Sequence, residues 1–185
     1  MNLIFIQGCQ YKIGFIYDGV AYHYRRNILG DIIEIYRQNT LVAKYVYDAW
    51  GNHKVLNPDG TENTNSTFIG NINPLRYRGY YYDVETQLFY CNSRYYSPEL
   101  CRWISPDSIE YLDPESINGL NLYCYCKNNP IMYADPSGHF AIITFLICLG
   151  VGVVAGAGLG ALSAAQQGED IWRGVLSGTL SDLVP

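Results

Sequence analysis

Cysteine, histidine and aspartate are the residues of this sequence that are best suited to chemistry, and their spacing already excludes one kind of site. The six cysteines and three histidines are Cys9, Cys91, Cys101, Cys124, Cys126, Cys148, His23, His53 and His139. No two cysteines form a C-x-x-C pair, and each histidine stands alone in the sequence. Thiolate metal sites normally show such pairs, so we expect no zinc site and no cofactor. The cysteines are also too scattered for a disulfide-stabilised miniprotein and are interpreted as small buried side chains.

One aspartate stands at the point where the sequence changes character. Asp135 lies in "NNPIMYADPSGHFAII", between a tyrosine-rich part of the chain and a stretch rich in glycine and alanine. An aspartate before proline commonly turns the chain. A carboxylate can also act as a general acid or base. Both interpretations of Asp135 remain open at this point.

Composition indicates a β-rich protein. The 185 residues include 18 tyrosines against 6 phenylalanines, and only 16% of residues are charged, with a net charge of −5. Tyrosine suits strands that have one packed face and one solvent-exposed face, because its ring can be buried while its hydroxyl group reaches water. The negative charge argues against nucleic-acid binding.

Short strands and turns recur at nearly constant spacing in the first half of the chain. In "LVAKYVYD" (41–48), apolar and aromatic residues alternate with a mixed set, as in a strand with one buried face. "YHYRRNILGD" aligns with "YVYDAWGN", so that both the Tyr-x-Tyr pair and the following turn match. The matching residues of the two segments lie 21 to 23 positions apart. Such an offset is typical of repeat architectures, in which each unit buries its face against its neighbours. The sequence predicts antiparallel hairpins in a curved, open sheet over residues 1–139.

The motifs resemble a known family. "YVYDAWGN" is similar to a YD repeat, and "RYRGYYYDVETQLFYCNSRYYSPELCRWISPD", followed by "NLYCYCKNNPIMYADPSGH", is similar to the Rhs repeat-associated core. The resemblance covers about residues 13–139 and implies the C-terminal part of a polymorphic toxin, whose YD repeats form a hollow β-shell. It divides the chain into degenerate YD repeats (1–75), the core (76–139) and a variable C-terminal segment (140–185).

The resemblance also implies a site. In the family the core acts as an aspartyl autoprotease that cuts after the DPxG motif. Carried over to this sequence, the carboxylates are Asp107 and Asp135, and Arg102 is the nearby cation. Two carboxylates that share a proton can act as acid and base. The cut would fall between His139 and Phe140, where Gly138 would let the backbone approach closely. The other interpretation is that both aspartates only cap or turn the chain.

Four positions depart from the family pattern. Asp107 is followed by "SIE" in place of proline and glycine, and His139 replaces a leucine. Gln87 and Cys101 stand where the family has turn glycines, so two tight turns are expected to be strained or reshaped.

The C-terminal segment is strongly apolar. Residues 140–165 carry no charge, and Gly152, Gly156, Gly160 and Ala164 follow at four-residue spacing. The stretch exceeds the roughly 20 residues of a membrane-spanning helix, and small residues at this spacing let helices pack closely in lipid. We predict an apolar helix, either for membrane entry, as a transmembrane anchor, or packed inside the shell. A truncated toxin region would follow it.

Three functions fit these observations. The first is a shell and core fragment that encloses and presents a C-terminal toxin in bacterial competition, with self-cleavage as its only enzymatic activity. Its expected partners are the remainder of the shell, the toxin segment, an immunity protein and a membrane in contact with residues 140–165. It would be secreted or at the cell surface as part of a longer protein. The second is a carbohydrate-binding or adhesion module with exposed tyrosines, and the third is a membrane-tethered structural protein.

Overall fold

The computed structural model describes residues 3–8, 11–115, 119–139 and 142–143. The chain divides into two units, Met1–Ala141 and Ile142–Pro185. Both sheets, both cores and the site discussed below belong to the first unit. In the second unit only strand β12 (Ile142–Ile143) is described.

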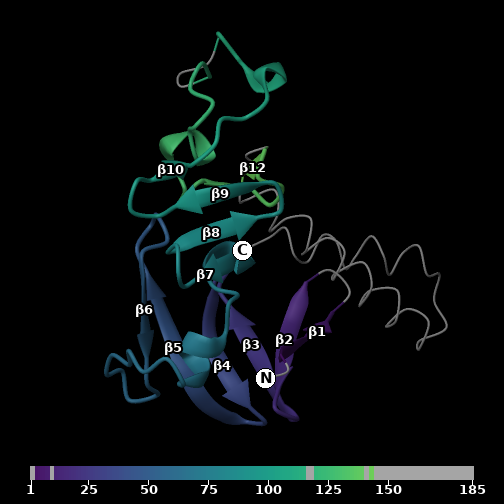
Figure 1. Cartoon of the computed structure of the whole chain (residues 1–185), viewed down its shortest axis with the longest axis vertical. Coiled ribbons are helices and arrows are strands. Elements are labelled where there is room, and N and C mark those ends of the chain that lie inside the picture. Colours follow the sequence, from purple (N-terminus) through teal and green to yellow (C-terminus); the bar gives the residue numbers. More distant parts are fainter. Residues whose placement is uncertain (1–2, 9–10, 116–118, 140–141, 144–185) are drawn as a thin grey trace, which may run out of the picture. The chain divides into compact units, whose positions relative to one another are not determined.

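The first unit is mainly β, as the sequence predicts, and its strands are antiparallel (Figure 1). Six strands form the first sheet in sequence order: β1 (Leu3–Gln7), β2 (Lys12–Tyr17), β3 (Val20–Arg26), β4 (Ile32–Arg37), β5 (Thr40–Tyr47) and β6 (His53–Leu56). Four strands form the second sheet in the order β10-β9-β8-β7: β7 (Tyr81–Asp83), β8 (Leu88–Cys91), β9 (Arg94–Ser97) and β10 (Arg102–Trp103). The remaining elements of this unit are the helix α1 (Ile69–Ile72), the 3-10 turns Tyr77–Gly79, Ile109–Tyr111 and Cys126–Asn128, and β11 (Tyr133–Ala134).

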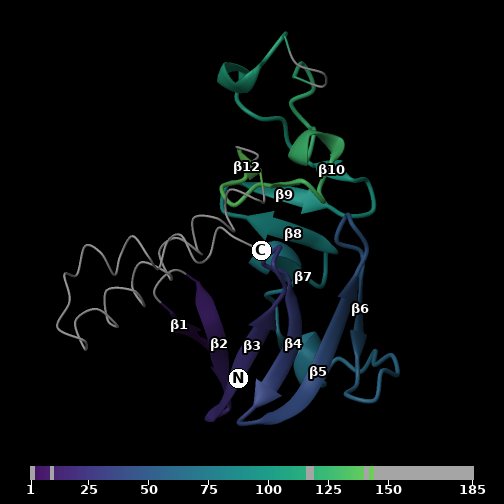
Figure 2. The ribbon, with the colours of Figure 1, turned by 180° about the vertical axis from the view of Figure 1, so that it is seen from behind.

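Strands β1 to β10 therefore form two separate sheets, where the sequence predicted one curved open sheet. The break falls in the segment 57–80 between β6 and β7, which contains an NPDG turn, several asparagines and α1. Asparagine, proline and glycine favour turns over strands. Figure 2 shows the same two groups of strands from behind.

Two turns of the first sheet, between β3 and β4 and between β5 and β6, share one design. Asn27 and Asp48 each accept two backbone N–H groups, from the residues two and four positions later, at 2.8–3.0 Å. Gly30 (φ 89°) and Gly51 (φ 94°) occupy the same left-handed position in the two turns, which glycine adopts without steric cost. The two segments that the sequence aligned as repeats thus end in the same turn.

Two hydrophobic cores hold the sheets, and the second is mainly aromatic. The first core contains Phe15, Ile32, Ile35, Ala43, Tyr45, Val55 and Leu75. The second contains Tyr77, Tyr80, Phe89, Cys91, Tyr96, Trp103, Tyr125 and Cys126. His53 of the first sheet touches the second, because its ring meets Tyr82 edge-on with centroids 4.6 Å apart. Tyr47 of the first sheet also contacts Tyr77 of the second core, with tilted rings whose centroids lie 6.0 Å apart.

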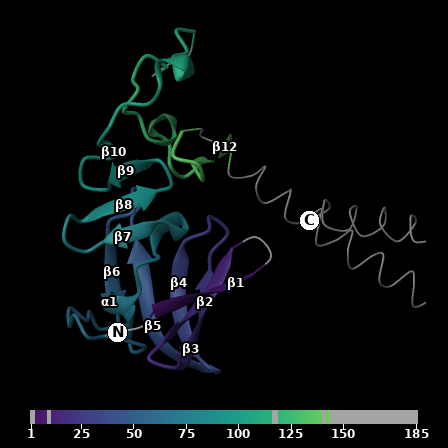
Figure 3. The same cartoon turned by 45° about the vertical axis from the view of Figure 1, so that its right-hand side comes forward.

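The segment from Ile104 to Leu120 leaves the second sheet and returns to it. Figures 1 and 3 show it extending away from the strands of both sheets. At its base, Asp107 N–H donates to the Leu122 carbonyl at 3.0 Å, and Trp103 N–H donates to the Tyr123 carbonyl at 3.0 Å. These bonds fix Asp107 next to the sheet.

Gln87 and Cys101 adopt the left-handed conformation that the missing glycines would adopt, with φ of 60° and 56°. Left-handed backbone is costly for residues that carry a Cβ. The backbone angles therefore agree with the strain that was expected at these two turns.

The predicted apolar helix 140–165 lies outside the described residues, except for Ile142 and Ile143. These two residues form a short strand in place of helix. None of the helices in the described ranges has the length and apolar character of a membrane span.

Candidate functional site

The DPSG turn is fixed to the hairpin that joins β8 and β9. Asn92 Nδ2 donates to the Pro136 carbonyl and Ser93 Oγ donates to the Ser137 carbonyl, each at 3.0 Å. The Cys91 thiol donates to the Asp135 carbonyl at 3.3 Å, and burial raises the pKa of this thiol to about 12, so that it keeps its proton. These contacts attach the border segment to the second sheet along its whole length.

Gly138 is required where the turn meets the hairpin. Its φ is +84°, and a Cβ at this position would lie 2.4 Å from both the Cys91 carbonyl oxygen and Ser93 Oγ. Only glycine allows such a close approach with this backbone conformation. The sequence had assigned this role to Gly138.

Arg94 on β9 is the centre of the site. Its side chain is 5% exposed, and its Nη2 lies 2.7 Å from Asp107 Oδ2 and 3.8 Å from Asp135 Oδ2. Its Nε donates to the Gly138 carbonyl and its Nη1 to the Leu122 carbonyl. Burial lowers the pKa of the guanidinium, and the two carboxylates oppose this effect. The two carboxylates compensate the positive charge of Arg94. Such pairing is needed because burying an unpaired ion is energetically costly.

Asp135 also organises its own turn. Its Oδ1 accepts from the backbone N–H of Gly138 at 2.7 Å and from those of Ser137 and His139 at 3.2 Å. Asp135 is 2% exposed. The turning role that the sequence allowed for this residue is therefore present, and its other oxygen faces Arg94.

Asp107 contacts the last residue before the predicted cut. His139 Nδ1 lies 2.7 Å from Asp107 Oδ1, while Oδ2 of the same carboxylate holds Arg94. The Tyr111 ring stacks on the imidazole, with centroids 5.7 Å apart and planes 12° apart. Asp107, Asp135, Arg94 and His139 thus form one cluster at the end of the core.

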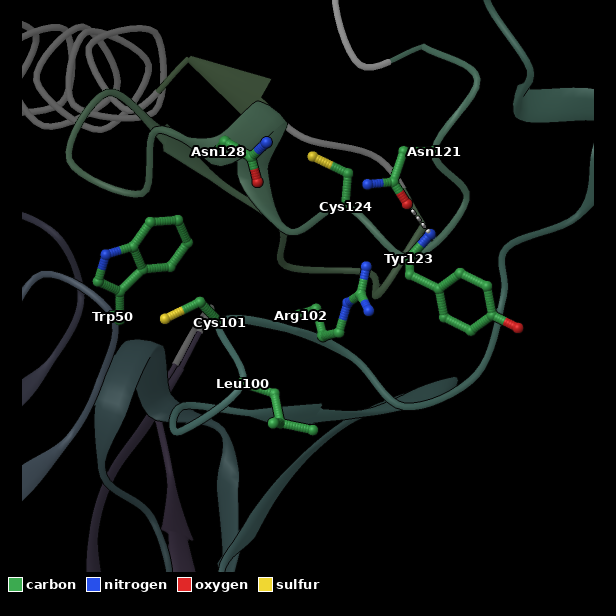
Figure 4. Close-up of a pocket in the computed structure, with 8 residues that line it drawn as sticks. All are labelled: Trp50, Leu100, Cys101, Arg102, Asn121, Tyr123, Cys124 and Asn128. Atoms are coloured by element: carbon green, nitrogen blue, oxygen red, sulfur yellow. Dashed lines mark hydrogen bonds between the residues drawn. The ribbon is translucent and has the colours of Figure 1, made fainter.

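Arg102, the cation that the resemblance implied, lies elsewhere. It precedes Trp103 on β10, and consecutive side chains of a strand point to opposite faces. Trp103 lies against Arg94, with the guanidinium 4.3 Å from the ring, whereas Arg102 lies 5.6 Å from the Tyr123 ring. Arg102 lines a cavity of about 350 Å³. Figure 4 shows it beside Cys101, Asn121 and Tyr123. Neither Asp107 nor Asp135 lines that cavity.

Arg94 was missed by the sequence analysis, although the sequence holds a signal for it. In "RYYS", Arg94 and Tyr96 are two positions apart and share a face of the strand. Tyr96 is fully buried, so Arg94 must be buried too and needs an anionic partner. Which carboxylate serves as that partner depends on long-range folding.

Known proteins similar to this chain include nucleases and a toxin pore. The chain is 36% identical over 164 residues to the tRNA(Glu)-specific nuclease WapA of Bacillus subtilis subsp. natto, a match that covers 88% of this chain and 6% of that protein. It is 39% identical over 120 residues to the tRNA nuclease WapA of Bacillus subtilis strain 168, covering 64% and 5%. Among solved structures, the Tc holotoxin pore of Photorhabdus luminescens matches with a TM-score of 0.51 and 27% identity, covering 71% of this chain and 6% of that chain. No family model matches the sequence.

The similarity is to a segment of each of these much longer proteins. The chain spans about one-twentieth of the length of each relative. The similarity agrees with the resemblance to Rhs toxin proteins drawn from the motifs.

Proposed function

We propose that this chain is the C-terminal shell and core segment of an Rhs-type polymorphic toxin, which encloses and presents a C-terminal toxin and cleaves itself after the DPSG turn. The matches to WapA nucleases and to a Tc holotoxin support the toxin class. In this proposal the chain is part of a larger secreted or cell-surface protein. Its partners are the remaining shell, the toxin segment and an immunity protein, with membrane contact through residues 140–165.

The arrangement of strands supports a role within a larger β-structure. β1 is an edge of the six-stranded sheet among the described strands, and an edge strand presents backbone groups that another strand can pair with. The Asn27 turn after β3 and the Asp48 turn after β5 share one design, so the same turn recurs every two strands. A preceding repeat can extend the sheet in the same way.

The observation that carries self-cleavage is the gathering of Asp107, Asp135 and His139 around Arg94. Asp107 and Asp135 are far apart in sequence, yet they lie 2.7 Å and 3.8 Å from the same guanidinium nitrogen. One of them contacts the side chain of His139 and the other its backbone N–H. Groups that take part in proton transfer are therefore held at the predicted cut site.

Mass spectrometry tests self-cleavage directly. The full chain should give two species, residues 1–139 and 140–185, while Asp107→Asn and Asp135→Asn should each give the intact chain. Asparagine keeps the shape of the side chain but cannot exchange a proton as a carboxylate does. Glu110→Gln, an exposed change in the same loop as Asp107, is the matched control and should cleave normally. A single full-length species in the unmodified chain and in both asparagine variants would show that the aspartates only turn the chain.

Tyrosine exposure bears on the carbohydrate-binding alternative. The tyrosines of the two cores are buried, which favours a shell. Tyr81, Tyr90 and Tyr95 are 41–47% exposed, however, and pair across β7, β8 and β9. Such a row of rings is suited to stacking on sugars and favours carbohydrate binding as a second candidate function. Titration of the uncleaved Asp135→Asn chain with cell-envelope oligosaccharides would distinguish carbohydrate binding from a shell function alone.

A further inference from the structure

We propose that a second cavity, between β1, β2, β3 and the segment before β7, binds a phosphate group, either as free phosphate or as the monoester of a small compound. The inference goes beyond the proposed function and does not depend on self-cleavage. The observation behind it is that three cations, Lys12, Arg26 and Arg78, line one cavity that none of the described carboxylates lines.

The cavity is small and lies within the first unit. Its volume is about 220 Å³, whereas drug-sized ligands occupy pockets of about 300–1,000 Å³. Lys12 begins β2 and Arg26 ends β3, while Arg78 and Gly79 belong to the connection between the two sheets. A ligand of this cavity would therefore bridge the first sheet and the connection to the second.

Arg78 is the buried cation of the cavity. Its side chain is 3% exposed, and its Nη1 and Nη2 donate to the carbonyls of Leu29 and Pro130. Its Nε is buried and has no hydrogen-bond acceptor among the described residues. The carboxylate of Asp31 lies 3.8 Å from Nε, and its oxygens already accept from the Arg78 backbone N–H and from Asn27 Nδ2. The charge of Arg78 is thus only loosely paired, and a buried charge without close compensation is costly.

Arg26 and Lys12 form no ion pair with a described residue. Arg26 Nη1 donates to the Gly30 carbonyl at 2.7 Å and Nη2 to the Lys12 carbonyl at 3.0 Å. These bonds fix the guanidinium but use only part of its five N–H groups. A Cβ at Gly79 would lie 2.7 Å from Arg26 Nη1, so glycine leaves room for the guanidinium there. Burial lowers the pKa of Arg26, which shows that nearby anions do not compensate its desolvation in full.

The balance of charge favours phosphate over a carboxylate. Three cations, less the one carboxylate of Asp31, leave two positive charges at the cavity. A phosphate monoester carries about −1.5 to −2 at pH 7, whereas a carboxylate carries a single negative charge. The planar guanidinium of Arg26 suits bidentate binding of phosphate, and Lys12 adds a point charge. A phosphate group therefore neutralises the cavity, and one carboxylate does not.

Isothermal titration calorimetry of the full, uncleaved Asp135→Asn chain tests the proposal. Inorganic phosphate is the titrant, at neutral pH and at an ionic strength held constant with potassium chloride. Phosphate should bind to a single site. Arg26→Gln should weaken binding at least about tenfold, because charge-assisted hydrogen bonds are lost. Arg26→Lys should retain part of the affinity, since it keeps the charge but loses the planar fork.

Arg25→Gln is the matched control. Arg25 precedes Arg26 on β3, does not line the cavity, and pairs with Glu34 at 3.0 Å. Its replacement removes the same charge from the same strand and should leave phosphate binding unchanged. Thermal denaturation shows whether each variant is folded. If Arg26→Gln does not fold, Lys12→Gln, an exposed change, replaces it in the test and should also weaken binding.

Two further titrants identify the chemistry of the ligand. Tighter binding of glycerol 3-phosphate than of inorganic phosphate would identify a small phosphate ester as the ligand, and equal or weaker binding would identify free phosphate. If acetate binds as tightly as phosphate, the cavity is a carboxylate site and the proposal is wrong. It is also wrong if phosphate binding does not saturate, or if Arg25→Gln weakens binding as much as the cavity variants do. Self-cleavage is unaffected by each of these results, because it is measured separately by mass.

Discussion

Single residues of this chain show how far a site can be anticipated before the fold is known. Asp107, Asp135 and Gly138 could be named in advance, because the motifs that contain them resemble the family core. Arg102 was carried over from the family resemblance, yet Arg94 contacts both carboxylates. The choice depends on which face of a strand is buried, and β10 turns Trp103, not Arg102, toward the site.

The half-buried His53 makes the stability of the fold depend on pH. Burial, together with the neighbouring Arg76, lowers the pKa of His53 to about 4. His53 takes up a proton near pH 6.5 in the unfolded chain, but only near pH 4 in the folded chain. The free energy of unfolding should therefore fall as the pH drops from about 6.5 to about 4, by on the order of 3 kcal/mol.

Urea denaturation of the uncleaved Asp135→Asn chain between pH 7 and pH 4 measures this effect. Carboxylates also titrate in this range, so the comparison is made with His53→Gln in the same background. Glutamine cannot gain the proton, and the fall in stability should be smaller in that variant. Parallel curves for the two proteins would show that His53 does not set the dependence.

At the scale of elements, strands were more predictable than turns. Alternation in 41–48 predicts the face that β5 buries, since Ala43 and Tyr45 are buried there and Val46 is exposed. The aligned repeats end in the same turn because an asparagine or aspartate and a glycine recur at matching positions. The excursion from Ile104 to Leu120 could not be predicted, because its position depends on bonds from Asp107 and Trp103 to the later residues Leu122 and Tyr123.

The turn between β7 and β8 offers a way to stabilise the fold. Gln87 has a φ of 60°, and relief of left-handed strain outweighs the flexibility that glycine adds to the unfolded chain. Gln87→Gly should raise the free energy of unfolding by up to about 1 kcal/mol. Glu85→Gly, in the same turn but without positive φ, should lower it by a similar amount. Thermal denaturation of both variants checks the prediction, which fails if the two changes act in the same direction.

In the first unit the six-stranded and four-stranded sheets are joined by aromatic contacts, and neither closes on itself among the described strands. The prediction of a single sheet over residues 1–139 was wrong, because residues 57–80 contain a turn, the helix α1 and the buried Arg76. Together these features change the direction of the chain. Arg76 donates to His53 of the first sheet and stacks over Tyr82 of the second, 4.5 Å from the ring. Such a joint is formed by residues far apart in sequence, so no local pattern reveals it.

An open sheet of this kind has a consequence for association. Strand β1 is an edge, and its Ile4 side chain is 59% exposed, so two chains can pair edge to edge. A lysine on an edge strand opposes such pairing, because it must be buried against the partner strand. Ile4→Lys in the uncleaved Asp135→Asn chain should weaken self-association about tenfold, which corresponds to about 1.4 kcal/mol.

Val20→Lys, an exposed change on the internal strand β3, removes a similar apolar side chain without altering the edge. Sedimentation velocity over a range of concentrations measures both. If the two variants dissociate equally, general surface hydrophobicity and not the β1 edge drives association.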